Sequence, residues 1–242
     1  GFALSGGTLN TITPAADFES SFKSIVNALT QNKARGIVAN LPAVGDIPYF
    51  RTIPYNGLHL TASEAQTLNE IYASAGITFA EGTNSFAVED PLAQTAGIRQ
   101  IEQGELLLLD LMLDADKELY LSGKQAIPKK YTLFHEQLQQ TRDAIAAYNT
   151  IIHAVAEEKH LALVDINALL KTAKPDRTYN PATLNIDYAR KGIFSLDGLH
   201  PNCFGQALMA NEFIRVINKT FNCNFEMVRS HRYQGIVFPS RP

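Results

Sequence analysis

The chain of 242 residues is 45% hydrophobic and 19% charged, with a formal net charge of −3. This length and apolar content indicate a single folded domain over 1–242 and exclude a disordered chain. With 21 basic against 24 acidic residues, no overall positive charge points to nucleic acid as a partner. No stretch reaches the roughly 18 apolar residues of a membrane span, because Asp110 interrupts the longest apolar run.

Helix and strand patterns alternate at both ends of the chain. Residues 18–29 have the apolar spacing of an amphipathic helix, and 36–41 read as a short buried strand. A long helix over 131–159 and a strand over 161–166 repeat this order, before a last helix over 202–220. Helices followed by short apolar strands are typical of an α/β fold with a parallel sheet.

The middle of the chain, 42–130, is rich in proline and glycine and differs from both ends. It contains one plausible strand at 77–80 and helical stretches at 62–74 and 93–110. We interpret this segment as an insertion in the domain, forming a lid or the rim of a pocket. The last residues, 224–242, show little periodicity and are expected to lie across the surface.

Two cysteines, Cys203 and Cys223, are separated by the last predicted helix. Sixteen helical residues between them rise roughly 24 Å, whereas a disulfide needs Cα atoms about 4.4–6.8 Å apart. We therefore expect two free thiols.

Other polar residues show no pattern of metal ligands, and neither a metal nor a cofactor is expected. A calcium loop would need glycine and regularly alternating acids, so a solvated acidic face is expected for Asp110, Asp114 and Asp116. Surface positions are expected for Glu81, Glu89 and Asp90. The i, i+4 spacing of a shared helix face is missing among His135, His153 and His160. Asn40, directly after a predicted strand, is a candidate pocket residue.

The strongest cluster for chemistry lies in 194–201, where Asp197 and His200 stand three residues apart. Gly198 between them and Pro201 after them favour a tight turn. There the carboxylate can accept the Nδ1 proton of the imidazole, which leaves Nε2 as a general base for a hydroxyl nucleophile. Alternatively, Asp197 caps the following helix and His200 is a surface residue. The spacing alone leaves both interpretations open.

This block resembles the C-terminal block of the SGNH/GDSL esterase and lipase family, where the Asp and His of a D-x-x-H-P sequence complete a Ser-His-Asp triad. Further segments look like a group of these hydrolases common in Bacteroidetes, namely 36–50, 80–91, 147–149 and 235–239. The resemblance covers essentially the whole chain. It implies a three-layer α/β/α fold with a parallel, flavodoxin-like sheet, and a catalytic role for Asp197 and His200.

The family's nucleophilic Gly-Asp-Ser-Leu block and its glycine and asparagine blocks have no match here. Residues 1–8 look like the stretch that follows the asparagine block, so we expect the chain to be truncated at its N-terminus. The sheet would then lack its first strands and leave an open edge, which the missing segment could fill as a separate chain. Ser5 and Ser195 lie on no strand–turn–helix elbow, and neither is expected to be the nucleophile.

The resemblance implies a serine esterase that hydrolyses carboxylic esters, lipids or acetylated glycans, with Asp197 and His200 in this chain and the serine upstream of it. On its own the chain is expected to be inactive. The alternative is a non-catalytic binding or structural domain on the same scaffold, because fold does not guarantee function. Family resemblance further implies a bacterial protein that is exported, as a periplasmic protein or an outer-surface lipoprotein.

Overall fold

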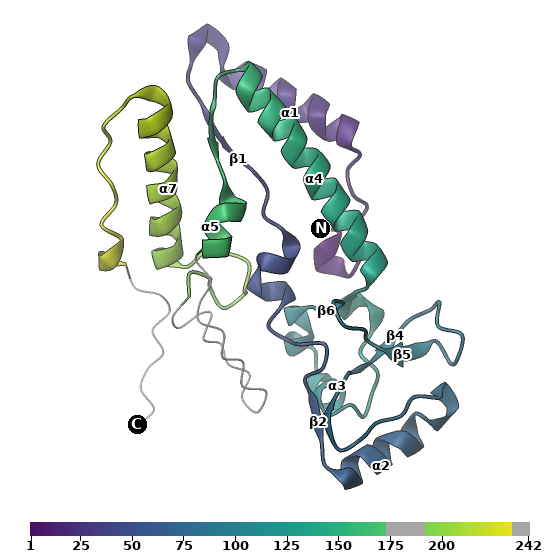
Figure 1. Ribbon diagram of the computed structural model, residues 1–242. Coiled ribbons are helices and arrows are strands. Elements are labelled where there is room, and N and C mark those ends of the chain that lie inside the picture. Colours follow the sequence, from purple (N-terminus) through teal and green to yellow (C-terminus); the bar gives the residue numbers. More distant parts are fainter. Residues whose placement is uncertain (173–191, 234–242) are drawn as a thin grey trace. The chain divides into compact units, whose positions relative to one another are not determined.

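The computed structural model describes residues 1–172 and 192–233, which form two compact units of mixed helix and strand (Figure 1). Of the described residues, the first unit contains 1–11 and 49–141, and the second contains 12–48, 142–172 and 192–233. The α/β character predicted from the sequence is confirmed. Residues 235–239, which carry part of the resemblance, and the rest of the tail beyond 233 lie outside the described residues. The interpretation of 42–130 as an insertion stays a prediction.

The second unit contains the parallel strands. Strand β1 (Ile37–Ala39) pairs with β8 (Ala162–Val164), and Val38 lies opposite Leu163 (Figure 1). The parallel pairing expected for these two segments is confirmed. Within the described residues this sheet has two strands.

Helices pack on this pair of strands. The helices of the unit are α1 (Ala15–Leu29), α4 (His135–Glu158) from residue 142 onward, α5 (Ile166–Thr172) and α7 (Cys203–Phe221). Val26 of α1 and Val155 of α4 form a buried cluster, against which Val38 and Leu163 pack. Because successive strand residues point to opposite faces, the neighbours of Leu163 in β8 point the other way. Helix α7 packs against β8.

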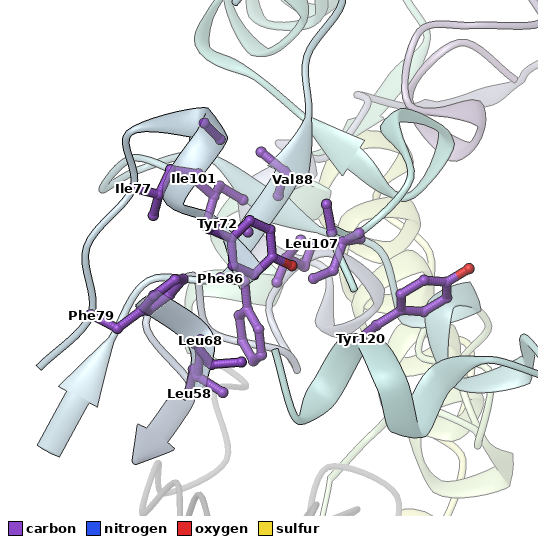
Figure 2. Close-up of a cluster of buried hydrophobic side chains, with 14 of the residues drawn as sticks. Leu58, Leu68, Tyr72, Ile77, Phe79, Phe86, Val88, Ile101, Leu107 and Tyr120 are labelled. Carbon is purple, nitrogen blue, oxygen red and sulfur yellow. The ribbon is translucent and has the colours of Figure 1, made fainter. Parts of the chain in front are cut away.

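The first unit is built from short antiparallel strand pairs. Its elements are β2 (Leu58–Leu60), α2 (Ala62–Ile71), β3 (Gly82–Asn84), β4 (Ala87–Glu89), β5 (Ile98–Gln100), β6 (Leu106–Leu107), α3 (Lys117–Leu121) and β7 (Thr132–Leu133). The pairs are β2 with β3, β4 with β5, and β6 with β7. Their apolar side chains meet in one core, in which Phe86, Val88 and Leu107 are almost completely buried (Figure 2).

Short 3-10 helices connect these elements. They span Ala3–Ser5, Gln31–Lys33, Val44–Asp46, Pro48–Phe50, Ala73–Ala75, Leu109–Leu113, Lys129–Tyr131 and Ser230–Arg232. None of the described helices combines the length and the apolar composition that crossing a membrane requires. Both thiols are free, as predicted, and α7 runs between Cys203 and Cys223.

The helix predicted over 93–110 is wrong. This stretch contains β5, β6 and the start of a 3-10 helix. Its backbone has positive φ angles at Ala96 (55°), Gly97 (65°) and Gly104 (94°). A left-handed residue cannot continue a right-handed helix, so the apolar spacing here reflects burial of turns and strands.

The strand predicted over 77–80 is wrong as well, although Ile77 and Phe79 are buried in the core. The backbone of Phe79 bonds to a side chain instead of a strand: its N–H donates to Asn69 Oδ1 (2.6 Å), and Asn69 Nδ2 donates to its carbonyl (3.0 Å). The amide of Asn69 thereby satisfies the groups that a partner strand would. Helix α4 begins at His135 rather than near 131, because Thr132–Leu133 pair with β6.

Candidate active site

The segment before α7 folds into a closed turn. Phe194 and Pro201 form an antiparallel bridge, and the Ser195 N–H donates to the His200 carbonyl across 2.7 Å. Gly198 has a φ of 67°, and its N–H donates to the Ser195 carbonyl (3.1 Å). The left-handed conformation favours glycine at this position. The backbone therefore brings the side chains at 197 and 200 to the same side of one tight turn, as the sequence predicted.

Asp197 and His200 are in direct contact. Nδ1 of His200 lies 2.6 Å from Oδ2 of Asp197, and the backbone N–H groups of Leu199 and His200 donate to Oδ1 at 2.9 and 3.0 Å. The side chain of His200 is 79% exposed and that of Asp197 is 45% exposed. Within the described residues Nε2 makes no hydrogen bond. The imidazole thus presents its second nitrogen to solvent.

The carboxyl of Asp197 is held in its charged form. Partial burial raises its pKa, but hydrogen bonds from Ser195, from the His200 ring and from two backbone N–H groups outweigh burial and hold the pKa well below its usual range. A charged carboxylate accepts the Nδ1 proton and stabilises an imidazolium. This arrangement suits His200 to act as a general base through Nε2.

Asn202 joins the turn to α7. It is buried at the N-cap, where its Oδ1 accepts the Gly205 N–H (2.9 Å) and its Nδ2 donates to the carbonyls of Gly192 and Phe194 (both 2.9 Å). A capping side chain satisfies a backbone donor that the helix itself leaves unpaired. Here the same amide also holds both sides of the turn, so the turn and the helix form one structural piece. The sequence predicted a helix start at this residue but not this second contact.

The turn lies toward the carboxyl ends of the parallel strands. At the other end of α7, Phe221 accepts a long hydrogen bond from Arg35 (3.5 Å), which comes just before β1. The start of α7 therefore points toward the ends of β1 and β8. Ligands of open α/β sheets bind at this edge.

Asn40 also lies at this edge, where it bonds to the segment that follows β8. Its Oδ1 accepts the Ile166 N–H (2.7 Å), and its Nδ2 donates to Asp165 (2.8 Å). Asn149 and Asn167 bond the backbone of Leu41 in the same way. These amides hold the chain between β1 and the start of α5, which gives Asn40 a structural role. Its candidate role as a pocket residue stays a prediction.

The hydroxyls of Ser5 and Ser195, the two serines considered from the sequence, do not donate to the His200 ring. The Ser195 hydroxyl donates to Oδ1 of Asp197 (2.6 Å). The Ser5 hydroxyl donates to the Phe2 carbonyl (3.0 Å) and accepts the Leu9 N–H (3.3 Å). Both hydroxyls are thus engaged in local turns. The contact of Ser195 with Asp197 was not predicted, although a hydroxyl two residues before an aspartate in a turn is a signal for it.

Asp114 departs from the expected solvated acidic face. Its side chain is partly buried. It accepts the hydroxyl of Tyr131 at 2.5 Å and pairs with Lys130 at 3.7 Å. Asp110 and Asp116 are exposed, as predicted. In the part of the chain that the structure describes, no three His, Cys, Asp or Glu side chains are grouped to hold a metal ion.

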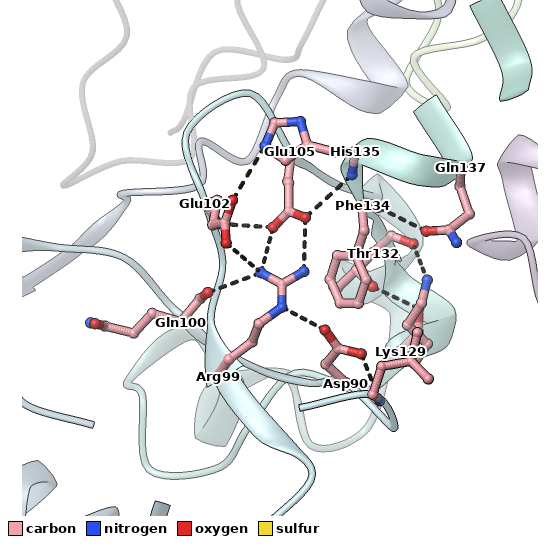
Figure 3. Close-up of polar contacts among 11 residues, drawn as sticks. Asp90, Arg99, Gln100, Glu102, Glu105, Lys129, Thr132, Phe134, His135 and Gln137 are labelled. Carbon is pink, nitrogen blue, oxygen red and sulfur yellow. Dashed lines mark hydrogen bonds and ion pairs between the residues drawn. The ribbon is translucent and has the colours of Figure 1, made fainter. Parts of the chain in front are cut away.

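Arg99 is the centre of a polar network in the first unit (Figure 3). Its guanidinium donates to both oxygens of Glu105 (2.7 and 2.8 Å) and to Asp90 (2.6 Å), and it lies 4.0 Å above the Phe134 ring centre. Asp90 is thus a partly buried ion-pair partner and not the surface acid that was expected. The network borders a hollow of about 420 Å³. Because these charged groups bind one another, they form a structural junction.

A larger hollow of about 1060 Å³ lies in the second unit, at the amino ends of the strands. It is bordered by the last residues of α1, α4 and α7, with Lys33, Arg35 and Lys159 among its lining residues. Basic side chains at helix C-termini interact favourably with the unpaired carbonyls there. The hollow is at the sheet edge away from Asp197 and His200.

Comparisons of the chain with protein-family models, with curated proteins and with solved structures find no match.

Proposed function

We propose that this chain carries the acid–base pair of a serine ester hydrolase of the SGNH/GDSL type. The observation that carries the proposal is the 2.6 Å contact between Asp197 and His200, in a turn that leaves Nε2 exposed. The nucleophilic serine is proposed to lie in sequence outside these 242 residues. Carboxylic esters, lipids and acetylated glycans are the substrate classes.

In the proposed reaction the serine oxygen attacks the ester carbonyl carbon, and its proton passes to Nε2 of His200. The imidazolium is stabilised by Asp197 and then protonates the departing alkoxide. Water attacks the resulting acyl-serine, again losing a proton to Nε2, and the serine leaves with that proton as the acid is released. The chemistry needs Nδ1 to keep its proton throughout, and the charged Asp197 carboxylate provides for this.

The packing of the second unit supports the fold that the proposal includes. Helices α1 and α4 cluster with Val38 and Leu163, and α7 packs against β8. A three-layer α/β/α arrangement with a parallel sheet would place helices in this way. The Asp197–His200 turn would then stand at the carboxyl edge, where a nucleophile on a neighbouring strand end could reach Nε2.

The test uses the protein expressed together with its upstream coding sequence, and follows hydrolysis of a short aryl ester. His200→Ala should lower kcat/KM by about 10²–10⁴-fold, the usual contribution of a general base. The matched control is His153→Ala, an exposed histidine of α4 in the same unit, which should leave turnover unchanged. Equal turnover in both variants would contradict the proposal.

A second measurement separates the hydrolase from a non-catalytic domain on the same scaffold. A serine-directed phosphonate should label the longer protein and leave the 242-residue chain unlabelled. Labelling of the short chain would mean that one of its own serines is the nucleophile. A longer protein that neither reacts with the phosphonate nor hydrolyses the ester would favour the binding or structural role.

A further inference from the structure

We infer that Ser195 is a positioning residue: its hydroxyl fixes the Asp197 carboxylate in the orientation that receives the Nδ1 proton of His200. The catalytic consequence of this role rests on the proposed function. The positioning itself is a property of the turn and can be tested without any turnover.

The two oxygens of Asp197 have separate tasks. Among the residues that the structure describes, Oδ2 contacts the ring nitrogen of His200 alone, at 2.6 Å. Oδ1 receives three donors, the Ser195 hydroxyl (2.6 Å) and the backbone N–H groups of Leu199 (2.9 Å) and His200 (3.0 Å). Rotation of the carboxylate would break all of these contacts at once. The donors on Oδ1 therefore determine where Oδ2 points.

Packing cannot supply this orientation. The side chains of His200 and Asp197 are 79% and 45% exposed, and within the described residues Asp197 is the one charged side chain that pairs with His200. A pair so open to water is oriented by its hydrogen bonds. Ser195 is the only side chain among the described residues that donates to Oδ1, and a hydroxyl donor to a carboxylate is stronger than a neutral pair.

The same turn holds the hydroxyl in place. The backbone N–H of Ser195 donates to the His200 carbonyl (2.7 Å), and the Ser195 carbonyl accepts the Gly198 N–H (3.1 Å). Ser195 thus contacts the histidine through its backbone and the aspartate through its side chain. This geometry supports the prediction that Ser195 is not the nucleophile, since a nucleophilic serine would donate to Nε2.

The first readout is the tautomer of neutral His200, measured by ¹⁵N NMR on the histidine-labelled 242-residue chain. The wild-type chain should hold the proton on Nδ1, where Asp197 accepts it. Ser195→Ala should move the population toward the Nε2–H form and raise the pKa of Asp197 toward its ordinary range. The matched pair Ser195→Thr and Ser195→Val differ in the hydroxyl alone, so Thr should keep the wild-type tautomer and Val should behave like Ala.

The control is Ser122→Ala, whose hydroxyl donates to a backbone carbonyl (3.2 Å) in the other unit; His200 should not respond to it. An Nδ1–H tautomer that persists in both Ser195→Ala and Ser195→Val would overturn the positioning role. If Ser195→Ala unfolds, the comparison of Ser195→Thr with Ser195→Val alone tests the positioning role.

The second readout is turnover in the protein with its upstream sequence. Ser195→Ala should lower kcat about tenfold, the effect of losing one hydrogen bond to a charged group, with little change in KM, and Ser195→Thr should restore it. Absence of turnover in every protein, together with the expected NMR changes, would refute the hydrolase and leave the positioning role intact. Full turnover in Ser195→Ala, with His200→Ala inactive, would overturn the positioning role instead.

Discussion

The turn before α7 depends on a close backbone approach at a single glycine. Gly205 lies in the first turn of α7, where a Cβ would come within 2.0 Å of the Ile193 carbonyl oxygen. The helix and the strand-like segment before the turn thus approach through bare backbone. The Asn202 side chain also bonds to Gly205 and to the segment before the turn. Together these contacts fix the position of the turn that carries Asp197 and His200.

Gly205→Ala should therefore destabilise the chain by about 1–3 kcal/mol or more, the usual cost of overpacking, because the clash is with backbone that cannot rotate away. Urea unfolding followed by circular dichroism measures this loss. Gly45→Ala is the control, since Gly45 has no atom within 4 Å of the added Cβ. The control should be neutral or slightly stabilising. Equal stability of the two variants would mean that α7 can shift away from Ile193.

At the scale of elements, polar junctions and not only apolar cores fix the short strands of the first unit. Arg99 in β5 links Asp90, after β4, to Glu105, before β6. The Glu105 side chain is 2% exposed, and it also accepts the N–H groups of Glu102 and His135. Strands of two or three residues are held in register here by one guanidinium.

Arg99→Met should cost about 3–5 kcal/mol, because it leaves the buried Glu105 carboxylate without its counter-charge. Thermal or urea unfolding provides the measurement. Lys23→Met is the control, since Lys23 pairs with Glu19 on the exposed surface of α1. An exposed pair contributes about 0–1 kcal/mol. Similar losses in the two variants would show that Glu105 is solvated when Arg99 is absent.

The elements also show which sequence patterns are enough to predict a helix or a strand. Helices α1, α4 and α7 and both parallel strands follow from apolar spacing, since each covers an amphipathic face or a short apolar run. Helix α5 was not predicted. In 93–110 the same spacing misled, because Gly97 and Gly104 adopt positive φ angles and the apolar residues are buried by chain reversals. At Phe79 the side chain of Asn69 makes the backbone hydrogen bonds that a partner strand would make. Neither the chain reversals in 93–110 nor the contact of Asn69 with Phe79 has a pattern in the local sequence that would predict it.

At the scale of the whole molecule, each unit has a buried apolar cluster of its own among the described residues. Leu107 is fully buried in the core of the first unit, and Leu161 packs with Val26 and Val155 in the second. Each cluster draws its residues from its own unit. We therefore expect local opening to occur unit by unit.

Leu107→Ala and Leu161→Ala should each cost about 2–5 kcal/mol through the cavity they leave. Hydrogen exchange should locate the loss. In Leu107→Ala, faster exchange is expected at the amides of Leu108 and Ile127, which bond within the first unit. In Leu161→Ala it is expected at Ala162, which bonds to the Gly36 carbonyl in the second. Uniform acceleration in both variants would indicate one cooperative molecule.

The sequence by itself determined the α/β character, the parallel pairing of two strands and the turn that joins Asp197 to His200. These depend on local spacing: an apolar period, or a glycine and a proline around an acid and a base. Only the tertiary structure decided the division into two units and the partial burial of Asp90 and Asp114 in ion pairs. Burial and hydrogen-bond partners come from chain segments that meet in space, so no local pattern could reveal them.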